Sequence, residues 1–135
     1  MNPYRILIVE DDEDIVETVK YALELRGFAV DVAYDGLHAL RKARKGEYDL
    51  MLLDIMLPGK NGYEVSRMLK TEMEQGKIKP FKIVVLTARK VDTPEREDFL
   101  ATWSNADEYL YKPFELDDLI DRIEMHLART PAGVH

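Results

Sequence analysis

Short apolar runs alternate with amphipathic segments along almost the whole chain, and this alternation limits the possible folds more than any other feature. A short apolar run followed by a segment with apolar residues every three or four positions predicts a strand followed by a helix. The expected strands are Arg5–Val9, Phe28–Ala33, Leu50–Leu53, Lys82–Leu86 and Glu108–Tyr111. The expected helices are Asp14–Arg26, Gly36–Lys45, Tyr63–Glu74, Pro94–Trp103 and Leu116–Ala128. Because the connections are short and favour right-handed crossovers, we expect an α/β fold: a single (βα)5 doubly wound domain, with a five-stranded parallel sheet and helices on both faces.

The size and charge of the chain restrict its organisation and its partners. A chain of 135 residues with 46% hydrophobic content suits one domain, which we expect at residues 1–129, followed by a flexible tail at residues 130–135. The net charge of −7 disfavours a direct nucleic-acid partner. No apolar stretch approaches the roughly 20 residues that span a bilayer, and acidic residues follow the amino terminus too closely for a signal peptide. We therefore expect a cytoplasmic protein without membrane insertion.

Polar residues stand where four of the predicted strands end. Glu10 and Asp11 follow the first strand, Asp54 follows the third, Thr87 the fourth and Lys112 the fifth. In open parallel sheets the carboxyl ends of the strands share one edge, and ligands bind outside that edge. We therefore expect these five side chains to form one pocket.

The residue types in this pocket indicate metal-assisted phosphoryl chemistry. Three converging carboxylates repel one another unless a cation is present, and Mg²⁺ suits a site with few carboxylates and retained waters. Lys112 can offset the charge of an incoming phosphoryl group, and Thr87 can donate a hydrogen bond to it. A carboxylate can itself accept the phosphoryl group, and Asp54, which lies centrally before a glycine-containing loop, is the best candidate.

Four segments in order, ILIVEDDED, LMLLDIMLPGKNG, IVVLTA and ADEYLYKPF, resemble the receiver domain of two-component response regulators. The resemblance extends from about Ile6 to Leu127. It implies a sheet with the strand order 2-1-3-4-5. It also implies that Asp54 is the phosphoacceptor, that Asp11 binds Mg²⁺ directly and that Glu10 acts through water. Met56 is expected to offer a backbone carbonyl to the metal, for which Mn²⁺ is a possible substitute.

The resemblance also assigns the residues that contact and sense the phosphoryl group. Thr87 and Lys112 are expected to contact the phosphoryl oxygens, and Tyr109 matches the aromatic residue that moves in the switch. Tyr109 is open to a second reading, as a half-buried strand aromatic with no switching role. The Lys112–Pro113 bond matches a cis peptide of the family. Met56 and Arg89 are expected to flank the route of attacking water and to slow the loss of the phosphoryl group.

The function implied is that of a phosphoacceptor, with no enzymatic activity beyond its own phosphorylation and dephosphorylation. A sensor histidine kinase or a histidine phosphotransfer protein donates the phosphoryl group to Asp54. The added charge draws Thr87 and Lys112 inward, Tyr109 repacks, and the surface of the fourth helix, fifth strand and fifth helix changes its affinity for a downstream protein. The cognate kinase, the downstream partner, the phosphoryl lifetime and the oligomeric state are not specified by the sequence.

Two biological contexts remain open, together with one enzymatic alternative. A stand-alone relay protein is favoured over the receiver portion of a longer regulator with a DNA-binding or enzymatic output domain. The enzymatic alternative, a magnesium-dependent phosphohydrolase that uses an aspartyl phosphate, usually carries a second acid where this chain has Met56. The segments Lys70–Pro80 and Arg89–Asn105 are longer than usual for the family, which predicts an extended third helix and a reshaped fourth helix. Asn105 stands where the family often has Gly, a substitution that Asn can tolerate if the backbone there is left-handed.

Overall fold

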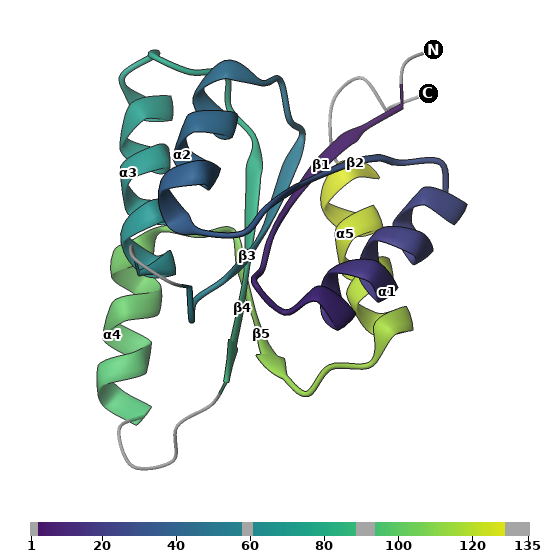
Figure 1. Cartoon of the computed structure of the whole chain (residues 1–135). Coiled ribbons are helices and arrows are strands. Elements are labelled where there is room, and N and C mark those ends of the chain that lie inside the picture. The colour runs from purple at the N-terminus through teal and green to yellow at the C-terminus, as the bar shows by residue number, and fades with distance from the viewer. Residues whose placement is uncertain (1–2, 58–60, 89–93, 129–135) are drawn as a thin grey trace.

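The computed structural model describes residues 3–57, 61–88 and 94–128, and within them the predicted alternation of strands and helices is confirmed (Figure 1). The strands are β1 (Arg5–Val9), β2 (Ala29–Ala33), β3 (Leu50–Asp54), β4 (Lys82–Ala88) and β5 (Glu108–Lys112). The helices are α1 (Glu13–Leu25), α2 (Gly36–Lys45), α3 (Gly62–Glu74), α4 (Pro94–Ser104) and α5 (Leu116–Ala128). The expected tail at residues 130–135 lies outside the described residues.

The five strands form one parallel sheet in the order β2-β1-β3-β4-β5, as predicted. The central strands β1, β3 and β4 are almost wholly apolar because both of their faces are covered. The more polar β2 lies at one edge, and β5 lies at the other. Every carboxyl end therefore lies along the same margin of the sheet.

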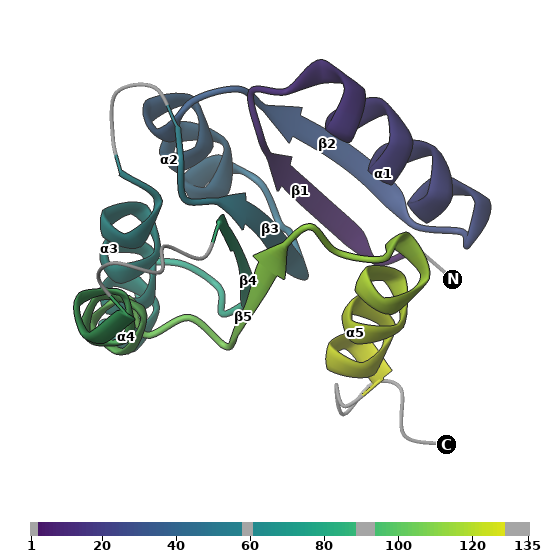
Figure 2. The same cartoon turned by 90° about the horizontal axis from the view of Figure 1, so that it is seen from below.

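Helices cover both faces of the sheet (Figure 2). Side chains alternate along each strand between these faces and build two separate cores. On β1, Leu7 and Val9 pack with α2 and α3, whereas Ile6 and Ile8 pack with α1 and α5. Residues of α4 pack against the first of these cores. The prediction of a doubly wound sheet is therefore confirmed.

Side-chain caps begin three of the helices close to the carboxyl margin of the sheet. The Asp12 carboxylate accepts hydrogen bonds from the backbone amides of Asp14 (2.9 Å) and Ile15 (3.3 Å). Asp35 caps α2 in the same way, and Asn61 caps α3 through the amide of Tyr63 at 2.7 Å. Such caps satisfy amide groups that the helix itself leaves without partners. They fix where the chain leaves the sheet and enters each helix.

Three strands extend further than the apolar runs predict, and this corrects the expected boundaries. Asp54, Thr87 and Lys112 lie inside β3, β4 and β5, whereas the sequence placed them just after the strands. Backbone pairing continues past the last apolar residue, with Asp54 opposite Leu86 and Ala88 opposite Lys112. The site residues therefore project from regular, paired backbone, which holds them more rigidly than a loop would. In the described part of the chain, no helix has the length and apolar character to cross a membrane.

Candidate functional site

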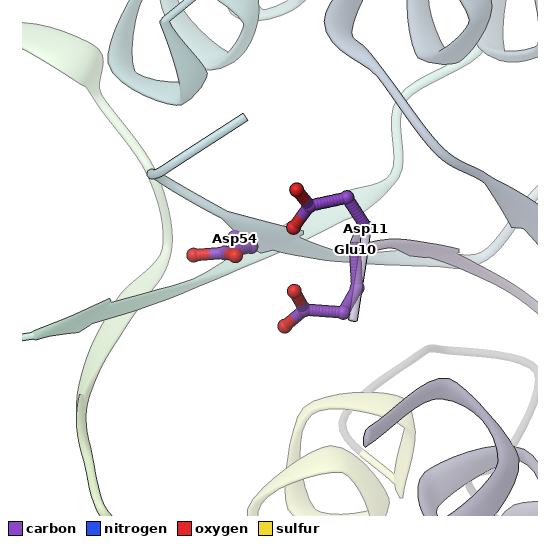
Figure 3. A group of neighbouring side chains, drawn as sticks. All are labelled: Glu10, Asp11 and Asp54. Carbon is purple, nitrogen blue, oxygen red and sulfur yellow. The ribbon is translucent and has the colours of Figure 1, made fainter. Parts of the chain in front are cut away.

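Glu10, Asp11 and Asp54 come together at the carboxyl margin of the sheet, as the sequence predicts (Figure 3). One carboxylate oxygen from each residue lies within 4.8 Å of the others. Glu10 and Asp54 are buried, with 2% and 3% of their surface exposed, while Asp11 faces solvent. The cluster therefore has two buried acids and one side open to an incoming group.

Backbone contacts hold the two buried acids in place. The amide of Met56 donates to Oδ1 of Asp54 at 3.1 Å, and the amide of Asp12 donates to Oε2 of Glu10 at 3.2 Å. The amide of Glu10 in turn donates to the carbonyl of Ala33 at 3.1 Å, which ties the end of β1 to β2. Each carboxylate is thus oriented by a backbone group on its own strand exit.

Gly62, the first residue of α3, allows the helix to approach Asp54 closely. A Cβ atom at this position would lie 2.7 Å from the carbonyl oxygen of Asp54 and 2.8 Å from the Cα of Ile55. The amide of Gly62 donates to the carbonyl of Ile55 at 3.2 Å. Glycine is therefore required where α3 packs against the end of β3, a role that the sequence indicated only as part of a turn-rich loop.

Lys112 lies between the two buried carboxylates. Its Nζ is 3.2 Å from Oε1 of Glu10 and 3.4 Å from Oδ2 of Asp54. The peptide bond from Lys112 to Pro113 is cis, as the sequence predicts. The ammonium group links β5 to β1 and β3 and supplies the one positive charge that directly contacts the described cluster.

The burial and charges of the cluster change its protonation. Burial, a hydrogen bond with Asp54 and the negative charge of Asp54 raise the pKa of Glu10 from 4.5 to about 7. Burial disfavours the charged form of Lys112, but the carboxylates of Asp54 and Glu10 outweigh this effect and raise the pKa of Lys112 above its ordinary value. Lys112 therefore stays charged, and the acids it faces carry more negative charge than it neutralises.

Thr87 lies on β4, the strand beside that of Asp54, and Tyr109 lies on β5, one strand further. Thr87 is 4% exposed near the end of β4. Tyr109 is half-buried on β5, packs against the core that holds α2 and α3, and donates its hydroxyl hydrogen bond to the carbonyl of Ala101 on α4. A half-buried position is confirmed for Tyr109, and its hydroxyl contact connects β5 to α4.

The donor set fits a hard divalent cation. Three carboxylates that contribute oxygens within 4.8 Å of one another, two of them buried, leave excess negative charge that a single lysine does not cancel. Oxygen ligands of this kind suit Mg²⁺, which retains several waters. Asp11, Asp54 and Glu10 are the residues that would hold it, while the backbone carbonyl of Met56 stays a predicted ligand.

Other sequence-based expectations have mixed outcomes. The Met56 side chain is 59% exposed, and Arg89 and residues 58–60 lie outside the described residues. Asn105 has a φ of 59°, so the backbone there is left-handed, which is the condition under which Asn can replace Gly at this position. His126, near the end of α5, is mostly buried, with 13% of its side chain exposed and its Nε2 atom 2.5 Å from Oε1 of Glu108. The helical pattern of α5 places it against β5.

An open parallel sheet with an acid pair, a central aspartate, a threonine and a lysine at its carboxyl margin defines a receiver module. A family model, the response regulator receiver domain, matches residues 6–124. The chain belongs to this family.

Individual relatives agree with the family assignment. The chain is 39% identical over 127 residues to the response regulator ArlR of Staphylococcus saprophyticus, with 94% of this chain and 54% of the relative covered. It is 42% identical over 121 residues to the transcriptional regulatory protein DltR of Streptococcus agalactiae, with 90% and 50% covered. The chain thus spans about half the length of these curated relatives.

A solved structure shows the same fold. The response regulator protein TrrA of Thermotoga maritima, crystallised in complex with Mg(2+)-BeF, is 36% identical and superposes with a TM-score of 0.75. The match covers 91% of this chain and 98% of that chain. The architecture is therefore shared along nearly the full length of both.

Proposed function

We propose that the chain is a phosphoacceptor that takes a phosphoryl group onto Asp54 from a phosphohistidine of a sensor kinase or histidine phosphotransfer protein, with Mg²⁺ bound beside it. The observation that carries this proposal is the convergence of Asp54 with Glu10, Asp11 and Lys112 at one margin of the sheet. The structure of the relative TrrA with Mg(2+)-BeF supports the choice of metal.

In the proposed transfer, one carboxylate oxygen of Asp54 forms a bond to phosphorus as the phosphorus–nitrogen bond to the donor histidine breaks. The leaving imidazole nitrogen takes up a proton. The Met56 amide holds Oδ1 of Asp54, so the side chain keeps a fixed orientation during the attack. Bound Mg²⁺ supplies charge stabilisation for the phosphoryl oxygens.

Lys112 stabilises the site both before and after Asp54 is phosphorylated. Before transfer it offsets the charge of Asp54 at 3.4 Å, and after transfer its ammonium group can follow the phosphoryl oxygens. The phosphoryl group adds roughly −1.5 to −2 charge units near neutral pH, which strengthens this attraction. Thr87, buried on the neighbouring strand, is proposed to donate to another phosphoryl oxygen.

The proposed output begins at Tyr109. When Thr87 moves toward the phosphoryl group, Tyr109 repacks, and its hydrogen bond to Ala101 transmits the change to α4. The chain then shifts its population between two existing conformations of the surface made by α4, β5 and α5. These conformations differ in their affinity for a downstream protein. In this proposal the chain has no catalytic activity on other substrates, and it acts in the cytoplasm.

Intact mass spectrometry after incubation with acetyl phosphate and Mg²⁺ tests the phosphoacceptor assignment. The wild type is expected to gain one phosphate, and Asp54→Asn none. Asp98→Asn, which changes an exposed acid on α4, serves as the matched control and should behave as the wild type. Equal labelling of Asp54→Asn, or no labelling of the wild type with Mg²⁺ present, would contradict the proposal.

The receiver can act as a stand-alone protein or as one domain of a longer regulator. The stand-alone relay favoured by the sequence stays a prediction. The matched relatives, which are about twice as long and include a transcriptional regulatory protein, support the alternative of a receiver joined to an output domain. Reading the gene beyond the codon for His135 distinguishes the two. Multiple turnover on a small phosphate ester would instead support the phosphohydrolase alternative.

A further inference from the structure

The outer face of α2 carries a row of basic side chains, although the chain as a whole has a net charge of −7. The helix packs on β1 and β2 beside α3 (Figure 1), and its ten residues include no acid but four basic residues, Arg41, Lys42, Arg44 and Lys45. Leu37, one turn before Arg41, is 60% exposed. Leu37, Arg41 and Lys45 recur every four positions, so they share one face. We name four residues the α2 strip: Leu37, His38, Arg41 and Lys45.

Two of the four basic residues are paired within the chain. The Nζ of Lys42 lies 2.7 Å from Oδ1 of Asp31, and the hydroxyl of Tyr48 donates to Oδ2 of the same carboxylate at 2.6 Å. Burial would raise the pKa of Asp31, but the hydrogen bonds from Lys42 and Tyr48 outweigh it and lower the pKa to about 2. Arg44 donates two hydrogen bonds to the carboxylate of Glu72 on α3, at 2.9 and 2.7 Å. The charges of Lys42 and Arg44 are therefore already balanced.

Arg41 and Lys45 differ from these two basic residues. Both are exposed, and in the part of the chain that the structure describes neither forms an ion pair. They line a hollow of about 380 Å³ together with four other residues, His38, Lys42, Gly46 and Tyr48. From His38 to Lys45 the helix rises about 10 Å, so the cations form a row and do not converge on one point. Two positive charges of this row are left for groups outside the chain.

The shape and charge of the α2 strip favour one kind of partner. A single phosphate reaches only one or two cations of a row this long, whereas an acidic helix presents carboxylates at the same spacing of three or four residues. Leu37 adds an apolar contact at one end, which a phosphate chain would not use. An anionic membrane or a nucleic acid presents an extended surface, which the acids elsewhere on this negatively charged chain repel. The strip therefore suits a narrow acidic partner that also carries an apolar side chain.

We propose that the α2 strip docks an acidic amphipathic segment of a partner protein, with carboxylates against Arg41 and Lys45 and an apolar side chain against Leu37. Exposed ion pairs each contribute little, so the complex is weak and reversible. The strip contains no residue of the phosphoacceptor site, so docking is independent of the chemistry at Asp54.

Fluorescence anisotropy of a labelled helical peptide, with Glu at every third or fourth position and one Leu, measures docking on the unphosphorylated chain. The titration is made at about 0.1 M salt, where a Debye length of about 10 Å screens distant acids more than facing pairs. The wild type is expected to bind saturably, and Arg41→Glu about tenfold more weakly. Lys20→Glu makes the same change of charge on α1, which covers the opposite face of the sheet, and should bind as the wild type. No binding by the wild type, or equal weakening by both variants, would overturn the proposal.

Two further comparisons test the apolar contact and the kind of partner. Leu37→Asn should weaken binding of the peptide several-fold, whereas Leu25→Asn, which changes a leucine of α1 with 69% exposure, should not; equal effects would contradict the contact at Leu37. Phosphatidylserine vesicles and a single-stranded oligonucleotide represent the other anionic partners. If either binds more tightly than the peptide and loses affinity in Arg41→Glu, the strip recognises lipid or nucleic acid and the proposal fails. All the replaced side chains lie at the surface, and the thermal midpoint of each variant checks that the fold is intact.

Discussion

Glu10 is the least exposed of the described charged side chains, and its protonation follows from that burial. It is 2% exposed and faces Asp54 as well as Lys112. A carboxyl whose pKa rises to about 7 in the folded state binds its proton more tightly there than in the unfolded chain. The stabilisation from this group is complete below the unfolded pKa of 4.5 and is lost as the pH rises through about 7.

We expect Glu10→Gln to make the metal-free protein more stable than the wild type above this window, because the amide carries no charge to be buried. The free energy of unfolding of Glu10→Gln, measured relative to that of the wild type, should be higher at pH 8 than at pH 4 by on the order of 2–3 kcal/mol. Urea unfolding in EDTA at the two pH values measures it. Glu17→Gln, which changes an exposed acid on α1, should show the pH dependence of the wild type, and an identical dependence in Glu10→Gln would contradict the interpretation.

The junctions between elements decide how accurately the strands present their side chains. At the start of α3, Gly62 lies so close to β3 that any Cβ would contact the Asp54 carbonyl at 2.7 Å. At the end of α4, Asn105 takes a positive φ of 59° that reverses the chain toward β5. One junction depends on the absence of a side chain, and the other on a residue that tolerates a left-handed backbone.

Gly62→Ala is expected to lower the free energy of unfolding by about 1–3 kcal/mol and to slow phosphate incorporation, because the backbone beneath Asp54 must shift. Urea unfolding and the rate of mass gain with acetyl phosphate give the two readouts. Glu64→Ala, on the same turn but exposed, should change neither. Normal stability and a normal rate in Gly62→Ala would show that the close approach is unimportant.

Asn105→Ala and Asn105→Gly separate backbone strain from side-chain contact. The alanine variant should lose about 1 kcal/mol because a Cβ without a local hydrogen-bonding group disfavours positive φ, whereas the glycine variant should keep the stability of the wild type. Thermal unfolding of the three proteins makes the comparison. If both variants lose the same stability, the effect comes instead from the side-chain hydrogen bond that Nδ2 of Asn105 donates to Oε1 of Glu74 at 3.4 Å.

The whole molecule couples metal binding to folding, because the acid cluster exists only when β1 and β3 are paired. Two segments far apart in sequence supply its three carboxylates, Glu10 with Asp11 from one and Asp54 from the other, so the unfolded chain has no equivalent site. A ligand that binds the folded state alone stabilises it by mass action.

Adding Mg²⁺ at ten times its dissociation constant should stabilise the protein by about 1.4 kcal/mol. This corresponds to a rise of roughly 5 °C in the thermal midpoint. In Asp11→Ala the response should disappear, while the midpoint without metal should rise because one repelling charge is gone. Differential scanning calorimetry with and without EDTA measures both. An undiminished response to Mg²⁺ in Asp11→Ala would place the metal elsewhere.

The sequence alone determined the order of elements, the two-sided sheet and the convergence of Glu10, Asp11, Asp54 and Lys112. It could do so because hydrophobic periodicity reports burial, and because parallel strands send their carboxyl ends to one margin. Only the tertiary structure decided how far the strands continue beyond Leu53, Leu86 and Tyr111, since backbone pairing depends on a neighbouring strand and not on the polarity of the side chain. The raised pKa of Glu10 and the closeness of Gly62 to Asp54 likewise arise from contacts between distant segments, which no local pattern encodes.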